Sequence, residues 1–291
     1  MLLYEDHDSI VTAIAFSPDG SLLATGSRNG SLILRDAFDN ATPLWPPGSK
    51  IVGILNLAFL SADRLLVVHD LGWEVLRQSD SLWPVVSRGE QFSLTYATPL
   101  SESLLAIGTG DRLNAVAGMF YLHDLKTGRT LQPIFRENHG VRSIAVSPAN
   151  KLVAWSTGGR EVKVWDIKKQ SPLAIRTSHT AWSLALAPDS SAVAFVQDWT
   201  VRVYDLNAKQ DRPLLKGHKG IISSLAFSPD GLTVATGSWD GTVRFWDPRT
   251  GHERAVFQWP VGKGFSLAFS PDGQRAAAGG DGGAVVVWDV E

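Results

Sequence analysis

Apolar and polar residues alternate with a period of two in many short stretches of the chain. Ile14-Ala15-Phe16 runs into a Pro-Asp-Gly turn, and Leu22-Leu23-Ala24-Thr25 follows before the chain turns again at Arg28-Asn29-Gly30. Proline presets the backbone for the second turn position, and glycine accepts the positive φ that hairpin turns require. No stretch of useful length has the 3.6-residue period of an amphipathic helix. The pattern therefore predicts short antiparallel strands and an all-β fold.

The turn sequences recur at a nearly constant interval. Ser-Pro-Asp-Gly occurs at 17–20, 228–231 and 270–273, and looser copies stand at 147–150 and 187–190. The prolines at 148, 188, 229 and 271 are 40, 41 and 42 residues apart. An aromatic residue followed by aspartate closes several units, as at Trp165-Asp166, Trp246-Asp247 and Trp288-Asp289. Strand-rich repeats of this length are typical of β-propellers, in which each repeat forms one blade.

These repeats resemble the WD40 repeat family, and the Ser-Pro-Asp-Gly turn looks like the version common in bacterial members. The best copy runs from Gly217-His218 through Leu225-Ala226-Phe227-Ser228 to Trp246-Asp247. The resemblance implies one domain over residues 1–291, a seven-bladed propeller of four-stranded antiparallel blades. Blades two and three are degenerate and rest mainly on spacing. The expected blades are approximately 7–46, 48–86, 88–135, 139–176, 179–216, 218–259 and 261–291.

The two ends of the chain are expected to meet in one blade. The last repeat ends at Trp288-Asp289-Val290-Glu291, which is the end of a third strand. Leu2-Leu3-Tyr4-Glu5 occupies the place that Pro213-Leu214-Leu215-Lys216 holds before His218. Residues 1–6 are therefore predicted to supply the outer strand of blade seven, which closes the ring and removes an open sheet edge.

Composition narrows the classes of function. The net charge is −2, from 27 basic and 29 acidic residues, so no global field attracts nucleic acid or an acidic membrane. The chain has no cysteine, which excludes disulfides, thiolate metal sites and cysteine nucleophiles and suits a reducing, cytoplasmic compartment. The first residues do not read as a signal peptide, and no stretch approaches the ~18 apolar residues of a membrane span.

His218, Ser238, Asp240 and Trp246 invite a catalytic interpretation because serine, histidine and aspartate occur together. In the WD40 family this set is a structural hydrogen-bond network that ties the strands of one blade together, and a buried indole N–H does need an acceptor. Partial copies such as His139, Thr157 and Trp165 in blade four also argue against catalysis. No metal-ligand motif, phosphate loop or nucleophile elbow occurs, so no cofactor, metal or catalytic residue is expected.

The family resemblance implies binding on the top face, where the loops between strands surround the mouth of the central channel. Side chains six residues before the turn proline are expected to point onto this rim, as are those just before the acidic residue of the turn between the second and third strands. Aromatic and arginine residues are enriched at binding hot spots. The predicted partner-binding residues are Trp182, Trp239, Arg28, Arg142, Phe92 and Phe265.

The function expected from these features is that of a non-catalytic scaffold or sensor module, a monomeric ring that binds a protein or peptide. Bacterial relatives of this kind suggest the recognition domain of a larger signalling protein. Two alternatives remain open at this stage. One is an enzyme or small-ligand propeller that uses the central channel. The other is a nucleic-acid-binding propeller, which would need a basic top face despite the neutral total charge.

Overall fold

The structure is a computed structural model that describes residues 1–36, 53–79, 82–90, 94–110, 117–147, 152–169, 171–259 and 261–290. Within these residues every regular element is a β-strand. The strands are β1 (Leu2–Tyr4), β2 (Val11–Phe16), β3 (Leu22–Ser27), β4 (Leu32–Asp36), β5 (Ile54–Ser61), β6 (Arg64–His69), β7 (Gly72–Arg77), β8 (Val85–Glu90), β9 (Leu94–Ser101), β10 (Leu104–Thr109), β11 (Gly118–Asp124), β12 (Arg129–Glu137), β13 (Val141–Val146), β14 (Leu152–Thr157), β15 (Glu161–Asp166), β16 (Ser171–Arg176), β17 (Leu184–Leu186), β18 (Ala192–Gln197), β19 (Thr200–Asp205), β20 (Gln210–Asp211), β21 (Leu215–Lys216), β22 (Ile222–Phe227), β23 (Val234–Ser238), β24 (Val243–Trp246), β25 (Glu253–Phe257), β26 (Ser266–Phe269), β27 (Arg275–Gly279) and β28 (Val285–Asp289).

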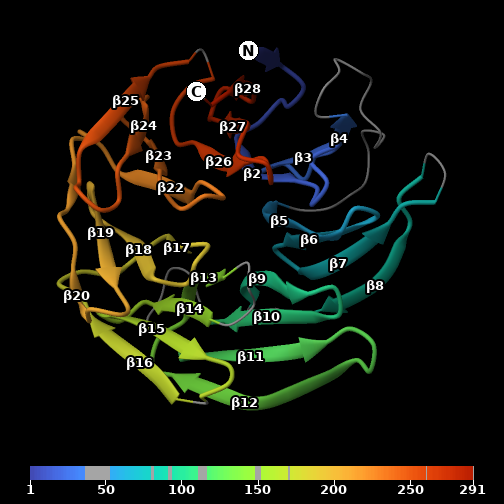
Figure 1. Ribbon diagram of the computed structural model, residues 1–291. Helices are drawn as coiled ribbons and strands as arrows, with labels where there is room; N and C mark the ends of the chain where they lie inside the picture. The colour runs from blue at the N-terminus through green and yellow to red at the C-terminus, as the bar shows by residue number, and fades with distance from the viewer. Residues whose placement is uncertain are drawn as a thin grey trace.

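The strands form seven antiparallel sheets arranged as the blades of a propeller (Figure 1). The innermost strands of the ring are β2, β5, β9, β13, β17, β22 and β26. Later strands of each blade lie progressively outward, except that β1 is the outermost strand of the last blade. In blade five, two short pieces, β20 and β21, both pair with β19 and together form the outer edge. Blade one shows three strands, and its expected outer strand falls within residues 37–52, outside the described residues. The seven-bladed architecture predicted from the repeats is confirmed.

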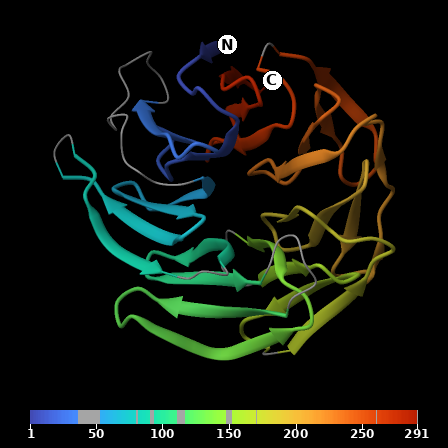
Figure 2. The same ribbon diagram turned by 180° about the vertical axis from the view of Figure 1, so that it is seen from behind.

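The ring is closed by the two ends of the chain. Strand β1 pairs antiparallel with β28, with Leu2 opposite Val287 and Tyr4 opposite Val285. The two termini consequently lie beside each other in both views (Figure 1, Figure 2). Tyr4 is buried and belongs to the core between blades seven and one. This confirms the predicted closure, and the physical reason is that the pairing covers an exposed edge of β28.

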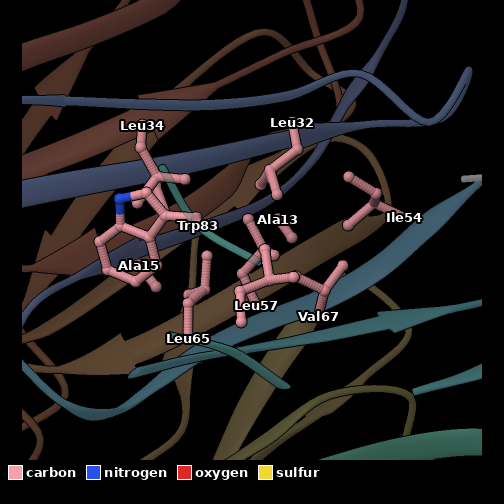
Figure 3. Packing of buried hydrophobic residues seen from close by; sticks show 11 residues of the cluster. Ala13, Ala15, Leu32, Leu34, Ile54, Leu57, Leu65, Val67 and Trp83 are labelled. Carbon is pink, nitrogen blue, oxygen red and sulfur yellow. The ribbon is translucent and has the colours of Figure 1, made fainter. Parts of the chain in front are cut away.

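The hydrophobic core is divided into layers between neighbouring blades. Between blades one and two, Leu32 and Leu34 of β4 face Leu57 and Leu65 across the layer, and Trp83 covers one end (Figure 3). Alternation along each strand sends one set of side chains to each neighbouring blade, which explains the period of two in the sequence. Trp83 lies just before β8, and its side chain is only 2% exposed and packs edge-on against Phe59.

The blades also contact one another closely through glycines on their second strands. A Cβ on Gly26 would stand 2.6 Å from Ile54, and one on Gly279 would stand 2.5 Å from Val11 of the next blade. Such a separation is too short for carbon atoms, so the residue that begins the next blade's inner strand fills the space that each glycine leaves. Adjacent blades are thereby held in fixed positions, which makes the loops at the channel mouth a rigid frame.

Candidate functional site

The loops leading into the inner strands and the turns between second and third strands lie on one face of the ring, which we call the top face. The Ser-Pro-Asp-Gly turns lie on the opposite face. A cavity of about 480 Å³ opens in the channel on the top side, and its walls include Thr12, Asn56, Arg142, Trp182 and Ser266. A second channel cavity of about 540 Å³ reaches the turn side, where Pro188, Pro229 and Pro271 line it.

Small polar side chains around the upper channel bond four of the blades to the next one. The Thr12 hydroxyl donates to the Ile54 carbonyl at 2.6 Å, and the Asn56 amide donates to the Ala97 carbonyl at 2.9 Å. The Ser223 hydroxyl donates to the Phe265 carbonyl at 2.9 Å, and the Ser266 hydroxyl donates to the Val11 carbonyl at 3.3 Å. At these four blades a polar side chain that lines the channel cavity also bonds the next blade.

Blades four and five depart from this arrangement. Arg142 directly follows Val141, which fills the space beside Gly108, as Thr12 follows Val11. Trp182 has the same place by strand register, two residues before Leu184 as Thr12 is two residues before Ile14. The guanidinium of Arg142 lies 5.0 Å from the ring centre of Trp182, which is a cation–π distance. Trp182 remains 53% exposed, and both side chains line the upper channel cavity. These two predicted residues are therefore brought together at the channel mouth.

Phe265 does not reach the rim, which corrects the sequence prediction. Its side chain is only 1% exposed and fills the space beside Gly237, as Val11 does beside Gly279. In this blade the channel position is five residues before the turn proline instead of six, so Ser266 has it. The predicted Phe92 lies outside the described residues. In blade three Thr95 makes the bond to the blade's own glycine carbonyl, Gly108, that Thr12 makes to Gly26.

Trp239 and Arg28 lie on the top face but do not belong to the described lining of the channel cavity. The Trp239 ring is 45% exposed and lies over Gly264, where a Cβ would stand 2.8 Å from the indole. Arg28 is exposed in the corresponding turn of blade one. Sequence reasoning missed Trp199, which is 55% exposed in the turn of blade five, and Ile221, which is 57% exposed beside Trp239. Trp199 directly follows Asp198, the acid of its turn, whereas the sequence prediction covered only the residue before that acid.

The network predicted in blade six is present, with one member corrected. His218 Nδ1 lies 2.8 Å from Asp240 Oδ2, and His218 Nε2 lies 2.7 Å from the hydroxyl of Thr236. The Trp246 indole donates to that same hydroxyl at 2.8 Å. The linking hydroxyl is therefore Thr236 and not Ser238, whose hydroxyl instead accepts from the Asp240 amide within the turn. Thr236 and Ser238 are two residues apart and face the same side of the strand, so the sequence pattern does not distinguish them.

Blade one repeats the corrected arrangement. His7 Nε2 lies 2.9 Å from the Thr25 hydroxyl, and Thr25 holds the strand position of Thr236. Arg35 replaces the tryptophan; it pairs with Asp6 and stacks 3.8 Å from the Tyr4 ring. Burial lowers the pKa of His7 to about 4, so its imidazole is neutral at pH 7.

The electrostatics of blade six fit a structural role. Burial lowers the pKa of His218, against the opposing effect of Asp240. Burial also favours the neutral form of Asp240, but hydrogen bonds from Thr242, Lys219 and His218 outweigh it and hold the pKa of this carboxyl below its ordinary value. A neutral buried histidine and a firmly ionised, fully bonded aspartate satisfy each other. Within the described part of the chain, no group of three or more histidine, aspartate or glutamate residues could hold a metal ion. No helix there is suited to crossing a membrane.

Blade four builds its network from different residues. Glu137, four positions before β13, takes the place that His218 holds before β22, and it is only 7% exposed. It accepts from the Trp155 indole at 2.9 Å and from Lys163 Nζ at 2.7 Å. Trp155 in turn has the strand position of Thr236, because it pairs with Lys163 as Thr236 pairs with Arg244. His139, read from the sequence as the network histidine, stands two residues too late.

Comparison with known proteins agrees with the repeats. The family model "WD domain, G-beta repeat" of WD40 matches residues 2–36, 129–166, 210–247 and 249–289, more than half of the chain. The serine-threonine kinase receptor-associated protein of Dictyostelium discoideum is 39% identical over 88 residues, 30% of this chain and 30% of the relative. The U3 small nucleolar RNA-associated protein 15 homolog of Gallus gallus is 28% identical over 237 residues, 78% of this chain and 43% of the relative.

A third relative, the ribosome biogenesis protein BOP1 of Rattus norvegicus, is 25% identical over 294 aligned positions, 82% of this chain and 38% of the relative. The chain thus spans less than half the length of each of these relatives. The likeness covers the repeated blades described above, and the family match extends over both the first and the last of them. On the strength of its repeats, its seven blades and this match, the chain belongs to the WD40 repeat family.

Proposed function

We propose that this protein is a non-catalytic recognition module that binds a segment of a partner protein at the channel mouth. Arg142 and Trp182 are the proposed main contacts. The observation that carries the proposal is their position in the ring. Thr12, Ser223 and Ser266 place a small hydroxyl at the equivalent position and use it to bond the next blade. Blades four and five instead place an arginine and a tryptophan there, which lie at a cation–π distance, and the tryptophan is 53% exposed.

The chemistry of this pair suits protein recognition. An indole offers a large, rigid surface at low entropic cost, and a guanidinium offers several hydrogen-bond donors in a fixed plane. The adjoining cavity of about 480 Å³ has room for one or two inserted side chains. Exposed Trp199, Ile221 and Trp239 on blades five and six would add apolar contact area around that anchor.

The relatives support the class of function rather than a particular partner. The names of the Gallus gallus and Rattus norvegicus relatives refer to an RNA-associated protein and to ribosome biogenesis, and the Dictyostelium discoideum relative is named as receptor-associated. Work as a monomeric ring in the cytoplasm is part of our proposal, as is the setting of a larger bacterial signalling protein. The near-neutral total charge favours a protein partner over nucleic acid.

Affinity capture from a lysate, with quantification by mass spectrometry, tests the proposal. The Arg142→Ala plus Trp182→Ala variant is compared with Trp199→Ala, which removes a tryptophan of nearly equal exposure outside the channel cavity. We expect at least one protein to be retained by the wild type and by Trp199→Ala and to fall tenfold or more with the double variant. Equal retention by all three would contradict the proposal, as would loss of every retained protein after RNase treatment. Thermal melts establish that the variants are folded.

A further inference from the structure

A third cavity, on the top of blade four, shares no lining residue with the channel. Its volume is about 490 Å³. It lies where the end of β12 meets the turn between β14 and β15 and the end of β16, toward the outer side of the ring (Figure 1). Its described lining residues are Arg136, Glu137, Asn138, His139, Thr157, Gly159, Arg160, Glu161, Lys163, Arg176 and Thr177.

The charges of this cavity do not cancel. The Lys163 ammonium is neutralised by Glu137, whose two carboxylate oxygens are already bonded to Lys163 and to Trp155. Three arginines then face a single further acid, Glu161. The described residues provide no ion pair to Arg136, Arg160 or Arg176, although arginines of neighbouring blades have them, as in Arg202–Asp211 and Arg244–Glu253. An excess of positive charge in a concave site attracts anions.

Blade four lacks a turn aspartate that blade six has. There the turn position of Gly159 is Asp240, whose carboxylate lies against His218 and accepts from the Lys219 amide. In blade four a Cβ at Gly159 would stand 3.2 Å from the Thr157 hydroxyl and 3.3 Å from His139 Nδ1. The Thr157 hydroxyl and the His139 imidazole therefore lie beside Gly159. At this turn position blade six has an aspartate carboxylate and blade four has no side chain.

Two arginines that line the cavity have uncharged counterparts in blade six. Arg160 stands where blade six has Gly241, and Arg176 stands where it has Gln258, by the register of the third and outer strands. The propeller fold does not require either charge, because blade six is built without them. Arginine side chains exposed without an acid partner around a preformed cavity are the arrangement that recognises phosphate through paired N–H donors.

We propose that this cavity is a binding site for a phosphate group, either of a small phosphorylated molecule or of a phosphorylated side chain. Arg136, Arg160 and Arg176 would neutralise the phosphate, and its oxygens would occupy the region beside Gly159. The cavity is far larger than a lone carboxylate, and a phosphate dianion matches the excess of two positive charges left by three arginines and Glu161. The site is independent of the partner surface at the channel mouth.

Isothermal titration with inorganic pyrophosphate tests the site directly. The wild type is compared with Arg160→Ala plus Arg176→Ala and with the control Arg129→Ala plus Arg249→Ala, which removes two exposed arginines elsewhere. We expect the first variant to bind at least tenfold more weakly and the control to stay within about twofold of the wild type. No measurable binding by the wild type at millimolar pyrophosphate, or equal weakening in both variants, would overturn the proposal.

Gly159→Asp gives a second test that removes no arginine. Its carboxylate would stand in the proposed anion position, as Asp240 does in blade six, and we expect pyrophosphate binding to fall tenfold or more while the melting temperature holds. Undiminished binding in this folded variant would contradict the location of the site. A short phosphoserine peptide and its unphosphorylated form identify the source of the phosphate. Binding of pyrophosphate alone indicates a small molecule, and tighter binding of the phosphopeptide indicates a modified protein.

Discussion

Blades four and six share the register of their first three strands but hold those strands together with different chemistry. In blade six a histidine, a threonine hydroxyl and an indole bond in sequence, and an aspartate completes the chain. In blade four a buried glutamate accepts from an indole and a lysine, and the turn aspartate is replaced by Gly159. The Trp246 N–H is satisfied, whereas the Trp165 N–H has no acceptor among the described residues.

The difference teaches that different sets of bonded polar residues can hold the strands of a blade together. Glu137 replaces a histidine, Trp155 replaces a threonine and Lys163 replaces an arginine, and these three replacements contact one another. A buried charge must be paired, so changes at these positions come together. The turn then no longer needs its aspartate, and its loss opens the cavity for which we propose a phosphate ligand.

The largest expected effect is that of Glu137→Ala. The change leaves a partly buried ammonium and a buried indole without their acceptor, so we expect unfolding free energy to fall by about 3 kcal/mol. Urea denaturation measures it. The matched change in blade six is Glu253→Ala, which breaks the more exposed pair with Arg244 and should cost less than about 1 kcal/mol. Equal costs would mean that the two blades do not differ in the way described.

The next largest effect is the loss of folding stability in acid, which comes from blades that contain a buried histidine. His7 has a folded pKa of about 4 because of burial, while an unfolded histidine titrates near 6.5. Between these values the unfolded chain binds more protons, so stability declines as the pH falls, by roughly 3 kcal/mol in all. Denaturation at several pH values should show a shallower decline for His7→Gln.

Thr236→Val and Ser238→Ala separate the two hydroxyls of blade six. Loss of the Thr236 hydroxyl leaves His218 Nε2 and the Trp246 indole N–H without a partner, which we expect to cost about 2 kcal/mol. Ser238→Ala removes only an acceptor for the Asp240 amide in the turn, at a cost below about 1 kcal/mol. Thermal unfolding measures both, and the reverse order would restore Ser238 as the linking residue.

The smallest effect comes from the indole N–H groups themselves. Trp246→Phe and Trp165→Phe create similar cavities, but only the first also removes a hydrogen bond. We expect Trp246→Phe to be the more destabilising by about 1 kcal/mol. Urea denaturation of both variants gives this difference, and an inverted order would show that Trp165 has an acceptor.

The repeat pattern was sufficient to predict the architecture because each blade is encoded locally. Proline and glycine mark the turns, and alternation within about five residues specifies the strands. Even the closure by Leu2–Tyr4 follows from a missing fourth strand in the last repeat. Arg142 and Trp182 were also predicted at the rim, since their distance from the turn is the same as that of Thr12.

Two predictions were wrong because they relied on counting residues from a turn or strand, whereas the position of the side chain depends on packing between blades. The residue that fills the inter-blade space is seven positions before the turn proline in blade one (Val11) but only six in blade seven (Phe265). Phe265 is therefore buried between blades and does not face the channel. His139 resembles the network histidine in sequence, but it stands two residues before β13 instead of four, and Glu137 has that place.

The sequence by itself determined the number of blades, the strand polarity and the ring closure, because these depend on short-range periodicity and on turn residues. Only the tertiary structure decided which hydroxyl reaches His218, which side chains remain exposed at the channel and which arginines surround the cavity on blade four. Each of these depends on contacts between strands or blades, where side chains two residues apart share a face and a shift of one residue reverses exposure.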